Sequence, residues 1–164
     1  MKYVLIGKIV NTHGLKGEVR ILSSFKYKNK VFIPKMKIYI GKDKIEEIIT
    51  TYRHHKIFEM ITMNGYNNID EVLKYKGDYV FINRDDLHLD KNEYLDEDII
   101  GLNVYTDNKC LGKVSKIENH NGNEILMVKN NDKFYLIPYN FDIIQDINLD
   151  LRTINVKNIP GLFD

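Results

Sequence analysis

Residues 7–21 of the chain read Gly7-Lys8-Ile9-Val10-Asn11-Thr12-His13-Gly14-Leu15-Lys16-Gly17-Glu18-Val19-Arg20-Ile21. In the last part of this stretch, apolar Val19 and Ile21 alternate with polar Glu18 and Arg20, which is typical of a half-buried strand. Residues 2–10 alternate more loosely and lead into a turn at residues 11–14. The stretch therefore predicts a β-hairpin, and its two loop glycines permit tight turns.

Short alternating segments continue along the rest of the chain and predict an all-β protein. They recur every ~8–12 residues, a spacing typical of sandwiches and barrels rather than of parallel α/β sheets. The expected strands cover residues 36–40, 45–52, 57–62, 79–82, 102–105, 111–117, 125–128, 134–137, 143–147 and 153–156. One short helix interrupts the first half, where Asn68 can cap it, Glu71 completes a capping-box pattern and Gly77 suits its C-terminal end.

A polar stretch without periodicity, residues 85–93, divides the chain. We expect two small β-barrels in tandem, at residues 1–84 and 94–164, joined by this linker. Residues 1–84 hold 16 Lys and Arg against 8 Asp and Glu, a net charge of +8, whereas residues 85–164 hold 8 against 15, a net charge of −7. This split favours a polyanion as partner of the first half and a basic protein as partner of the second, or else two domains that attract each other.

The composition excludes several classes of protein. It is 43% hydrophobic and 29% charged, which is typical of a globular protein. No apolar run approaches the ~18 residues of a membrane span, and the apolar segment at residues 3–6 is too short for a signal peptide. We therefore expect a cytoplasmic protein without membrane association. The single cysteine, Cys110, rules out an intramolecular disulfide and a Cys-based zinc site.

Catalytic and metal-binding patterns are weak in this sequence. His54 and His55 are neighbours, so in a strand their side chains point to opposite faces. No obvious activating base stands near Cys110, and the acids at residues 96–98 are typical of a solvated cluster. The nucleophile elbow, the dinucleotide fingerprint and the zinc-deaminase signature are absent. We expect no catalytic residues, no metal and no cofactor.

Two basic segments of the first half are candidates for RNA binding. In the first loop, Lys16 and Arg20 can meet phosphates and His13 can donate a hydrogen bond, although the spacing is not that of a P-loop. Residues 25–30 alternate aromatic residues with lysines, which suits backbone tracking and base stacking. The candidate RNA-binding residues are His13, Lys16, Arg20, Lys26, Lys28 and Lys30. The alternative is a pair of strand connections with solvated charges.

A bulky apolar pair, Tyr94-Leu95, lies among acidic residues at the start of the second half. An aromatic anchor rimmed by acids suits the binding of a basic protein. The candidate partner-binding residues are Tyr94, Leu95, Asp96, Glu97 and Ile99. The alternative is that Tyr94 and Leu95 plug the end of the second barrel.

Residues 7–21 resemble the opening signature of the RimM ribosome maturation factors. In that family, a Gly-x-Ile strand precedes a His-Gly-hydrophobic-basic-Gly-Glu-hydrophobic-basic loop and strand. Further segments resemble the family in the same order, namely Arg84-Asp85-Asp86-Leu87, Glu93-Tyr94, residues 98–104, 111–114, 122–126 and 136–138, and Pro160-Gly161-Leu162. Residues 26–66 match only loosely, and Leu95 stands where the family often has a second aromatic residue.

The resemblance implies an N-terminal barrel like those of translation factors, followed by a PRC barrel. It also implies a non-catalytic assembly factor for the small (30S) ribosomal subunit that promotes maturation and processing of 16S rRNA. Its implied partners are the ribosomal RNA of the 30S precursor and a head-region protein of the small subunit, the nineteenth, which the aromatic residues near position 94 bind. We expect the chain to be a monomer. Two other hypotheses stay open, a PRC-barrel adaptor with a non-ribosomal partner in RNA metabolism and an RNA-processing enzyme.

Overall fold

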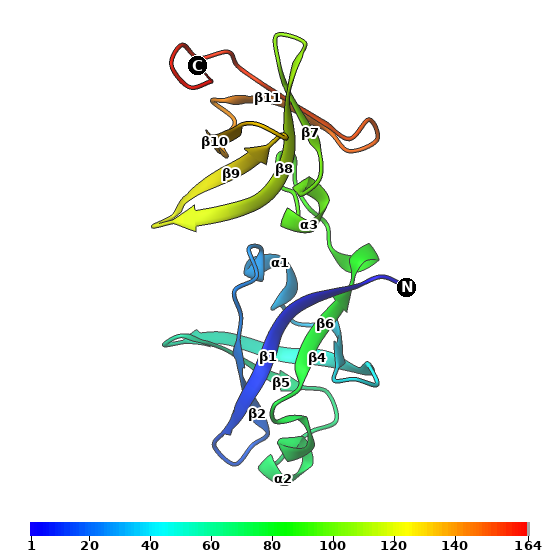
Figure 1. The fold of residues 1–164 in the computed structure, drawn as a ribbon. Helices are drawn as coiled ribbons and strands as arrows, with labels where there is room; N and C mark the ends of the chain where they lie inside the picture. The colour runs from blue at the N-terminus through cyan, green and yellow to red at the C-terminus, as the bar shows by residue number, and fades with distance from the viewer. Residues whose placement is uncertain (164) are drawn as a thin grey trace. The chain divides into compact units, whose positions relative to one another are not determined.

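The stretch at residues 7–21 forms the expected hairpin in a computed structural model that describes residues 1–163 (Figure 1). It consists of β1 (Tyr3–His13) and β2 (Glu18–Leu22), paired antiparallel. Val19 and Ile21 are fully buried, whereas Glu18 and Arg20 keep partial exposure. The alternation in the sequence is therefore an alternation between core and surface.

Six strands close into a barrel in the first of two compact units, Met1–Leu89. The order around the barrel is β1-β2-β5-β4-β3-β6. β1 pairs with both β2 and β6, and its pairing register shifts once on each side, which gives the local bend that closure requires. The other strands are β3 (Lys37–Ile40), β4 (Ile45–His55), β5 (Phe58–Met63) and β6 (Tyr79–Asn83).

The predicted helix is α2 (Ile69–Val72), continued by a 3-10 turn at Leu73–Tyr75. Asn68 Oδ1 accepts a hydrogen bond from the backbone N–H of Glu71 at 3.1 Å, which confirms the expected cap. Val72 and Tyr75 are buried, so this helix covers part of the barrel core.

The first unit contains another helix, α1 (Lys28–Val31), which the sequence pattern did not predict. It is a single turn without a side-chain cap. Val31 and the following Phe32 are 0% and 1% exposed, so packing rather than helix propensity holds this turn.

The chain enters the second unit, Asp90–Asp164, after Leu89. Arg84–Asp86 form a short 3-10 helix, with Asn83 Oδ1 accepting from the Asp85 N–H at 3.0 Å. Leu87 is buried. The first part of the predicted linker at residues 85–93 is therefore ordered within the first unit.

The second unit is a six-stranded sheet in the order β10-β9-β8-β7-β12-β11, preceded by α3 (Asp96–Ile99). Its strands are β7 (Asn103–Thr106), β8 (Lys109–His120), β9 (Asn123–Lys129), β10 (Phe134–Pro138), β11 (Ile144–Asn148) and β12 (Thr153–Val156). β7 and β12 pair parallel and the other neighbours antiparallel. Each strand contributes to one core, through Val104, Leu111, Leu126, Ile137, Ile144 and Ile154. The six strands therefore share a single core.

Strands make up 48% of the chain and helices 11%, which confirms the predicted all-β class. Within residues 1–163, no helix has the length and apolar character needed to cross a membrane.

Candidate nucleic-acid interface

The loop between β1 and β2 is held against the start of α2. The backbone N–H of Ile69 donates to the carbonyl of Leu15 at 3.0 Å. Gly17 has φ +90°, and a Cβ at this position would lie 3.3 Å from backbone atoms of Asn68. Glycine is therefore required at residue 17 both for its conformation and for close packing. This packing fixes the loop and leaves Lys16 exposed.

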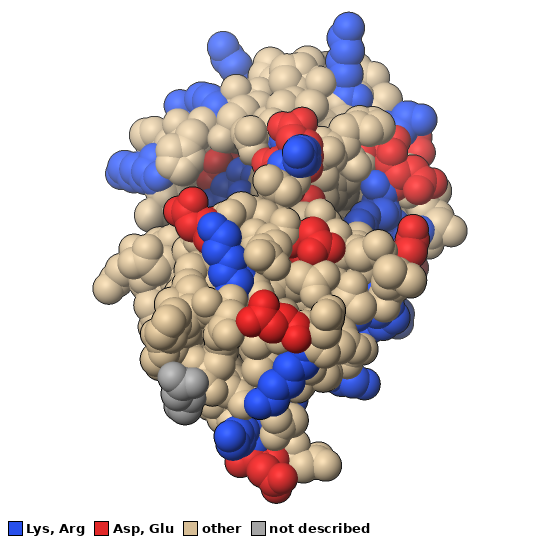
Figure 2. All heavy atoms as spheres, turned by 90° about the horizontal axis from the view of Figure 1, so that it is seen from above, with Lys and Arg blue, Asp and Glu red and all other residues tan. Residues whose placement is uncertain are grey.

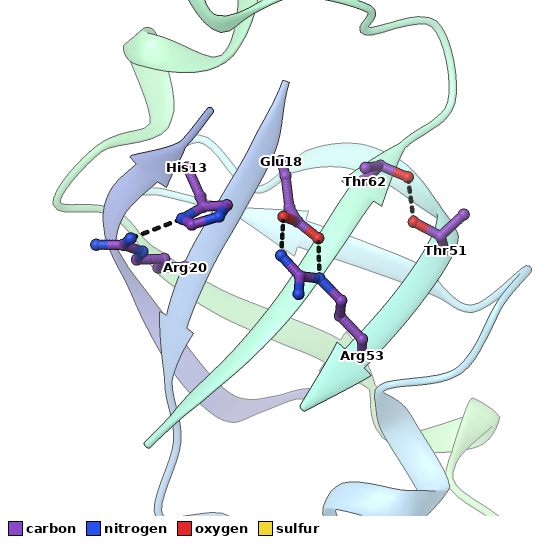
Figure 3. Close-up of polar contacts among 6 residues, drawn as sticks. All are labelled: His13, Glu18, Arg20, Thr51, Arg53 and Thr62. Carbon is purple, nitrogen blue, oxygen red and sulfur yellow. Dashed lines mark hydrogen bonds and ion pairs between the residues drawn. The ribbon is translucent and has the colours of Figure 1, made fainter. Parts of the chain in front are cut away.

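His13 and Arg20 form a contact on the outer surface of this hairpin. Arg20 Nη2 lies 2.6 Å from His13 Nδ1 (Figure 3). Because a guanidinium can only donate, His13 Nδ1 accepts, and the proton of a neutral imidazole sits on Nε2. The Arg20 guanidinium also lies 5.5 Å from the centre of the Phe58 ring on β5. His13 thus has an Nε2–H donor, and Arg20 has further N–H donors, with which to bind a phosphate.

Arg53 on β4 extends this surface across β5. Its Nε and Nη2 donate to the two carboxylate oxygens of Glu18 at 2.9 and 2.8 Å (Figure 3). The hydrogen bond and positive charge of Arg53 lower the pKa of Glu18 despite its partial burial, and His13 and His55 act in the same direction when they are protonated. Glu18 is therefore ionised at neutral pH, and its two carboxylate oxygens hold the Arg53 guanidinium in a fixed orientation.

His55 lies beside His13, with ring centres 6.1 Å apart. Desolvation lowers the pKa of His55, and the charges of Arg53, Lys56, His13 and Arg20 act in the same direction. We call the six side chains of His13, Glu18, Arg20, Arg53, His55 and Phe58 the hairpin face. It combines two guanidinium groups, two imidazoles and one aromatic ring, which suits contact with phosphates and bases.

His54 belongs to a different network from its neighbour. Its Nδ1 lies 2.9 Å from Glu59 Oε1, which also accepts from the Tyr52 hydroxyl at 2.7 Å. Glu59 is 1% exposed. Burial, followed by the hydrogen bond to Glu59, raises the pKa of Tyr52 to about 12. This network is structural, because its carboxylate is sealed from solvent.

The structure separates the six candidate RNA-binding residues into two groups. His13, Lys16 and Arg20 belong to the β1–β2 hairpin, whereas Lys26, Lys28 and Lys30 lie on or beside α1. The β1–β2 loop and α1 lie at opposite ends of the first unit in Figure 1.

The aromatic residues beside α1 differ in burial. Phe25 and Tyr27 contact each other with ring centres 6.2 Å apart, and buried Phe32 stacks on Tyr52. Phe32 is therefore closed to base stacking, whereas Phe25 and Tyr27 stay partly exposed, as Phe58 does on the hairpin face.

The candidate protein-binding residues of the second unit differ strongly in accessibility. Leu95 is 5% exposed and Ile99 is 0% exposed, and Ile99 belongs to the core of this unit. Tyr94 is partly buried and packs against the same core. Asp96 is half-buried and Glu97 exposed on α3. Tyr94, Asp96 and Glu97 are therefore accessible enough to contact a partner. Leu95 and Ile99 are buried and can act only by holding these residues in place.

Metal ligands and the single thiol are the remaining candidates for chemistry among residues 1–163. Among residues 1–163, no group of three or more His, Cys, Asp and Glu side chains is placed to hold a metal ion. Cys110 is an exposed free thiol on β8.

The charge division follows the two structural units. Residues 1–89 hold 16 Lys and Arg against 10 Asp and Glu, a net charge of +6, and residues 90–164 hold 8 against 13, a net charge of −5. Basic and acidic side chains are nevertheless interspersed on the face seen in Figure 2. Net charge therefore distinguishes the units, but individual sites have to be identified from local contacts.

Comparison with known proteins decides the family. The model of the RimM N-terminal domain matches residues 4–87, and that of the RimM PRC barrel domain matches residues 96–162. The chain belongs to the RimM family. The ribosome maturation factor RimM of Staphylococcus haemolyticus is 40% identical over 98% of this chain and 99% of its own length. The RimM factor of Exiguobacterium sp. is 37% identical over 100% of this chain and 98% of its own.

A solved RimM structure from Pseudomonas aeruginosa is also similar, at 22% identity and a TM-score of 0.48, covering 96% of this chain and 98% of that one. The curated relatives confirm the resemblance to the RimM family that residues 7–21 indicate.

Three residues of the hairpin face lie outside the RimM signature at residues 7–21, namely Arg53, His55 and Phe58. Their approach to residues 13–20 depends on strand order, because β5 and β4 follow β2 around the barrel. The i, i+2 spacing of Arg53 and His55 is the one local signal that both share a face.

Proposed function

We propose that this chain is a non-catalytic maturation factor of the small ribosomal subunit that acts in the cytoplasm as a monomer. In this account, it binds ribosomal RNA of the 30S precursor and a basic head-region ribosomal protein, the nineteenth, and promotes processing of 16S rRNA. The observation that carries the proposal is the match to both RimM domains in order, together with relatives named ribosome maturation factors.

RNA binding is assigned to the first unit. Its net charge of +6 attracts a polyanion at long range, and the hairpin face supplies directional donors at short range. Arg20 rests on a neutral ring and an imidazole, so its charge is not cancelled by a carboxylate. Glu18 neutralises the charge of Arg53, so Arg53 contributes to the shape of the RNA-binding surface rather than to its net charge. Lys26, Lys28 and Lys30 are assigned to a second RNA contact at the other end of the unit.

Binding of the ribosomal protein is assigned to the start of the second unit. Tyr94 supplies an aromatic ring at the surface of the core, and Asp96 and Glu97 supply negative charge beside it. Aromatic anchors account for much of the affinity of protein interfaces, and charges at the rim accelerate association with an oppositely charged partner. Leu95 and Ile99 are assigned a supporting role because they are buried.

The proposal is tested by two titrations of the full chain. Fluorescence anisotropy measures binding to a labelled fragment of precursor 16S rRNA, and calorimetry measures binding to the purified head-region protein. We expect saturable binding in both, with the RNA affinity falling steeply as salt rises because bound phosphates release counterions. Absence of saturable binding to either molecule contradicts the proposal.

A further inference from the structure

The second unit contains a cleft that the proposed function does not use. It has a volume of about 430 Å³ and is lined by Lys113, Ser115, Lys129, Asn130 and Asn131. All five residues are polar and none is acidic. This lining is unusual for a unit whose net charge is −5.

Two lysines lie side by side on adjacent strands at the cleft. Lys113 on β8 and Lys129 on β9 are direct partners in the antiparallel ladder, and both are exposed. Within residues 1–163, neither forms an ion pair, whereas Lys116 on the same strand contacts Glu118 at 2.7 Å. Like charges placed directly opposite each other in a sheet destabilise it. A bound anion between the two ammonium groups would remove this repulsion.

The backbone around the two lysines is fixed. Gly112 has φ +142°, and a Cβ there would lie 2.5 Å from the carbonyl oxygen of Lys129, so glycine is needed for β8 to approach β9. Asn130 Nδ2 donates to the carbonyl of Leu111 at 2.9 Å, and its Oδ1 accepts from the N–H of Lys133 at 2.8 Å. The floor of the cleft is thus held by the close strand approach at Gly112 and by the hydrogen bonds of the Asn130 side chain to the main chain, without the lysine side chains.

The chemistry of the cleft fits a phosphate group. Lysine ammonium groups bind phosphates as point charges on flexible stems, and the side-chain amide of Asn131 can donate as well. The Ser115 hydroxyl donates a hydrogen bond to the carbonyl of Met127 at 3.0 Å, so it can only accept a hydrogen bond from a ligand. We propose that the Lys113–Lys129 cleft binds a phosphodiester of RNA, which gives the acidic second unit its own contact with the RNA backbone.

This inference rests on the proposed function, because it requires that the chain binds ribosomal RNA. Its consequence is that the two units both contact RNA. A phosphate held by two lysines offsets the repulsion that a unit of net charge −5 otherwise experiences beside a polyanion.

The test uses the full chain and the double variant Lys113→Gln, Lys129→Gln. Binding to a precursor 16S rRNA fragment is measured at several salt concentrations. Each lost phosphate contact should reduce the slope of log K against log salt by about 0.7 on single-stranded RNA. Because the cleft holds one phosphodiester, the double variant should lose about 0.7 of slope. The matched control is Lys91→Gln, Lys157→Gln, two exposed lysines of the same unit outside the cleft, which should leave the slope unchanged.

A second arm separates RNA from free phosphate. Inorganic phosphate is titrated while the amide resonances of Ser115 and Asn131 are followed by NMR. We expect small shifts at millimolar phosphate and the same residues to be perturbed at micromolar RNA, with both effects lost in the double variant. Saturation by micromolar phosphate would instead identify a free-phosphate site.

An RNA slope equal to that of wild type in the double variant overturns the inference while leaving the proposed function intact. If the wild-type chain binds no ribosomal RNA, the failure lies with the proposed function and is seen without any variant. Loss of binding to the ribosomal protein with unchanged RNA binding would assign the cleft to a protein instead. The double variant should melt no lower than wild type, because it removes two opposed positive charges.

Discussion

Glu18 and Arg53 join β2 to β4 across the intervening β5, with two hydrogen bonds of 2.8 and 2.9 Å between one guanidinium and one carboxylate. The two residues are 35 positions apart in the sequence. Their pairing brings Arg53 of β4 into the surface built by the signature hairpin.

This ion pair predicts a pH dependence of stability. The pKa of Glu18 lies below its ordinary value of 4.5 in the folded state. The carboxylate therefore stabilises the fold fully above pH 4.5, and this contribution is lost as pH falls through the lowered folded-state pKa. Glu18→Gln should lower the free energy of unfolding at pH 7, and the difference from wild type should shrink towards zero in acid.

Urea unfolding at a series of pH values checks this expectation. Asp43→Asn, which changes an exposed carboxylate in the same unit, is the control and should show a smaller difference. A Glu18→Gln difference that is constant from pH 7 to pH 3 contradicts the assigned role of the ion pair.

Arg20 should contribute more to RNA binding than Arg53. No carboxylate among residues 1–163 forms an ion pair with Arg20, whereas Glu18 neutralises Arg53. Arg20→Gln should reduce the salt slope of RNA binding by about 1, and Arg20→Lys should keep the slope because it keeps the charge. Lys42→Gln, an exposed charge on the β3–β4 turn, is the control. Equal effects of Arg20→Gln and Lys42→Gln would point to diffuse attraction without a site at the hairpin face.

The two loop glycines should differ in their tolerance of alanine. Gly14 has φ +67°, and a Cβ added there would meet no atom within 4 Å, whereas Gly17 has φ +90° and abuts the backbone of Asn68. Gly14→Ala should cost about 1 kcal/mol for the left-handed conformation alone. Gly17→Ala should cost up to about 3 kcal/mol, because strain adds to the close contact.

Thermal and urea unfolding of both glycine variants measure these costs. Equal destabilisation by the two substitutions would show that packing of the loop on α2 adds nothing to stability.

Substitutions at the start of the second unit should affect either stability or binding, depending on how deeply the residue is buried. Leu95→Ala should destabilise the chain by about 2–5 kcal/mol, as is usual for a buried leucine. Tyr94→Ala should remain folded and lose affinity for the basic ribosomal protein, because the ring is only partly buried. Asp96→Asn with Glu97→Gln should slow association modestly.

Circular dichroism melts beside calorimetric titration distinguish these effects. If the Tyr94→Ala variant binds within twofold of wild type, the protein interface lies elsewhere.

The sequence predicted local features better than contacts between distant segments. The alternation of Val19 and Ile21 identified β2, and Asn68 with Glu71 identified the start of α2, because both signals lie within a few residues. Arg53 reaches Glu18 through strand order, which no local pattern encodes. α1 was missed because its single turn depends on buried Val31 and Phe32 rather than on capping.

The role of Leu95 was ambiguous for a physical reason. A leucine beside an aromatic residue and acids serves equally as an exposed anchor or as a plug of the core, and only burial distinguishes the two. Leu95 is the extended residue that precedes α3, and Ile99 is the last residue of that helix. Both are buried, which the sequence pattern alone did not establish.

The central claim is that the chain matures the small ribosomal subunit by binding its precursor. In the most direct measurement, the tagged full chain is expressed in a bacterium that lacks its own RimM protein, and the lysate is separated on a sucrose gradient. We predict that the chain sediments with small-subunit particles that contain unprocessed 16S rRNA, and that the Arg20→Gln variant shifts towards the top of the gradient. Sedimentation of the wild-type chain away from small-subunit precursors would contradict the account.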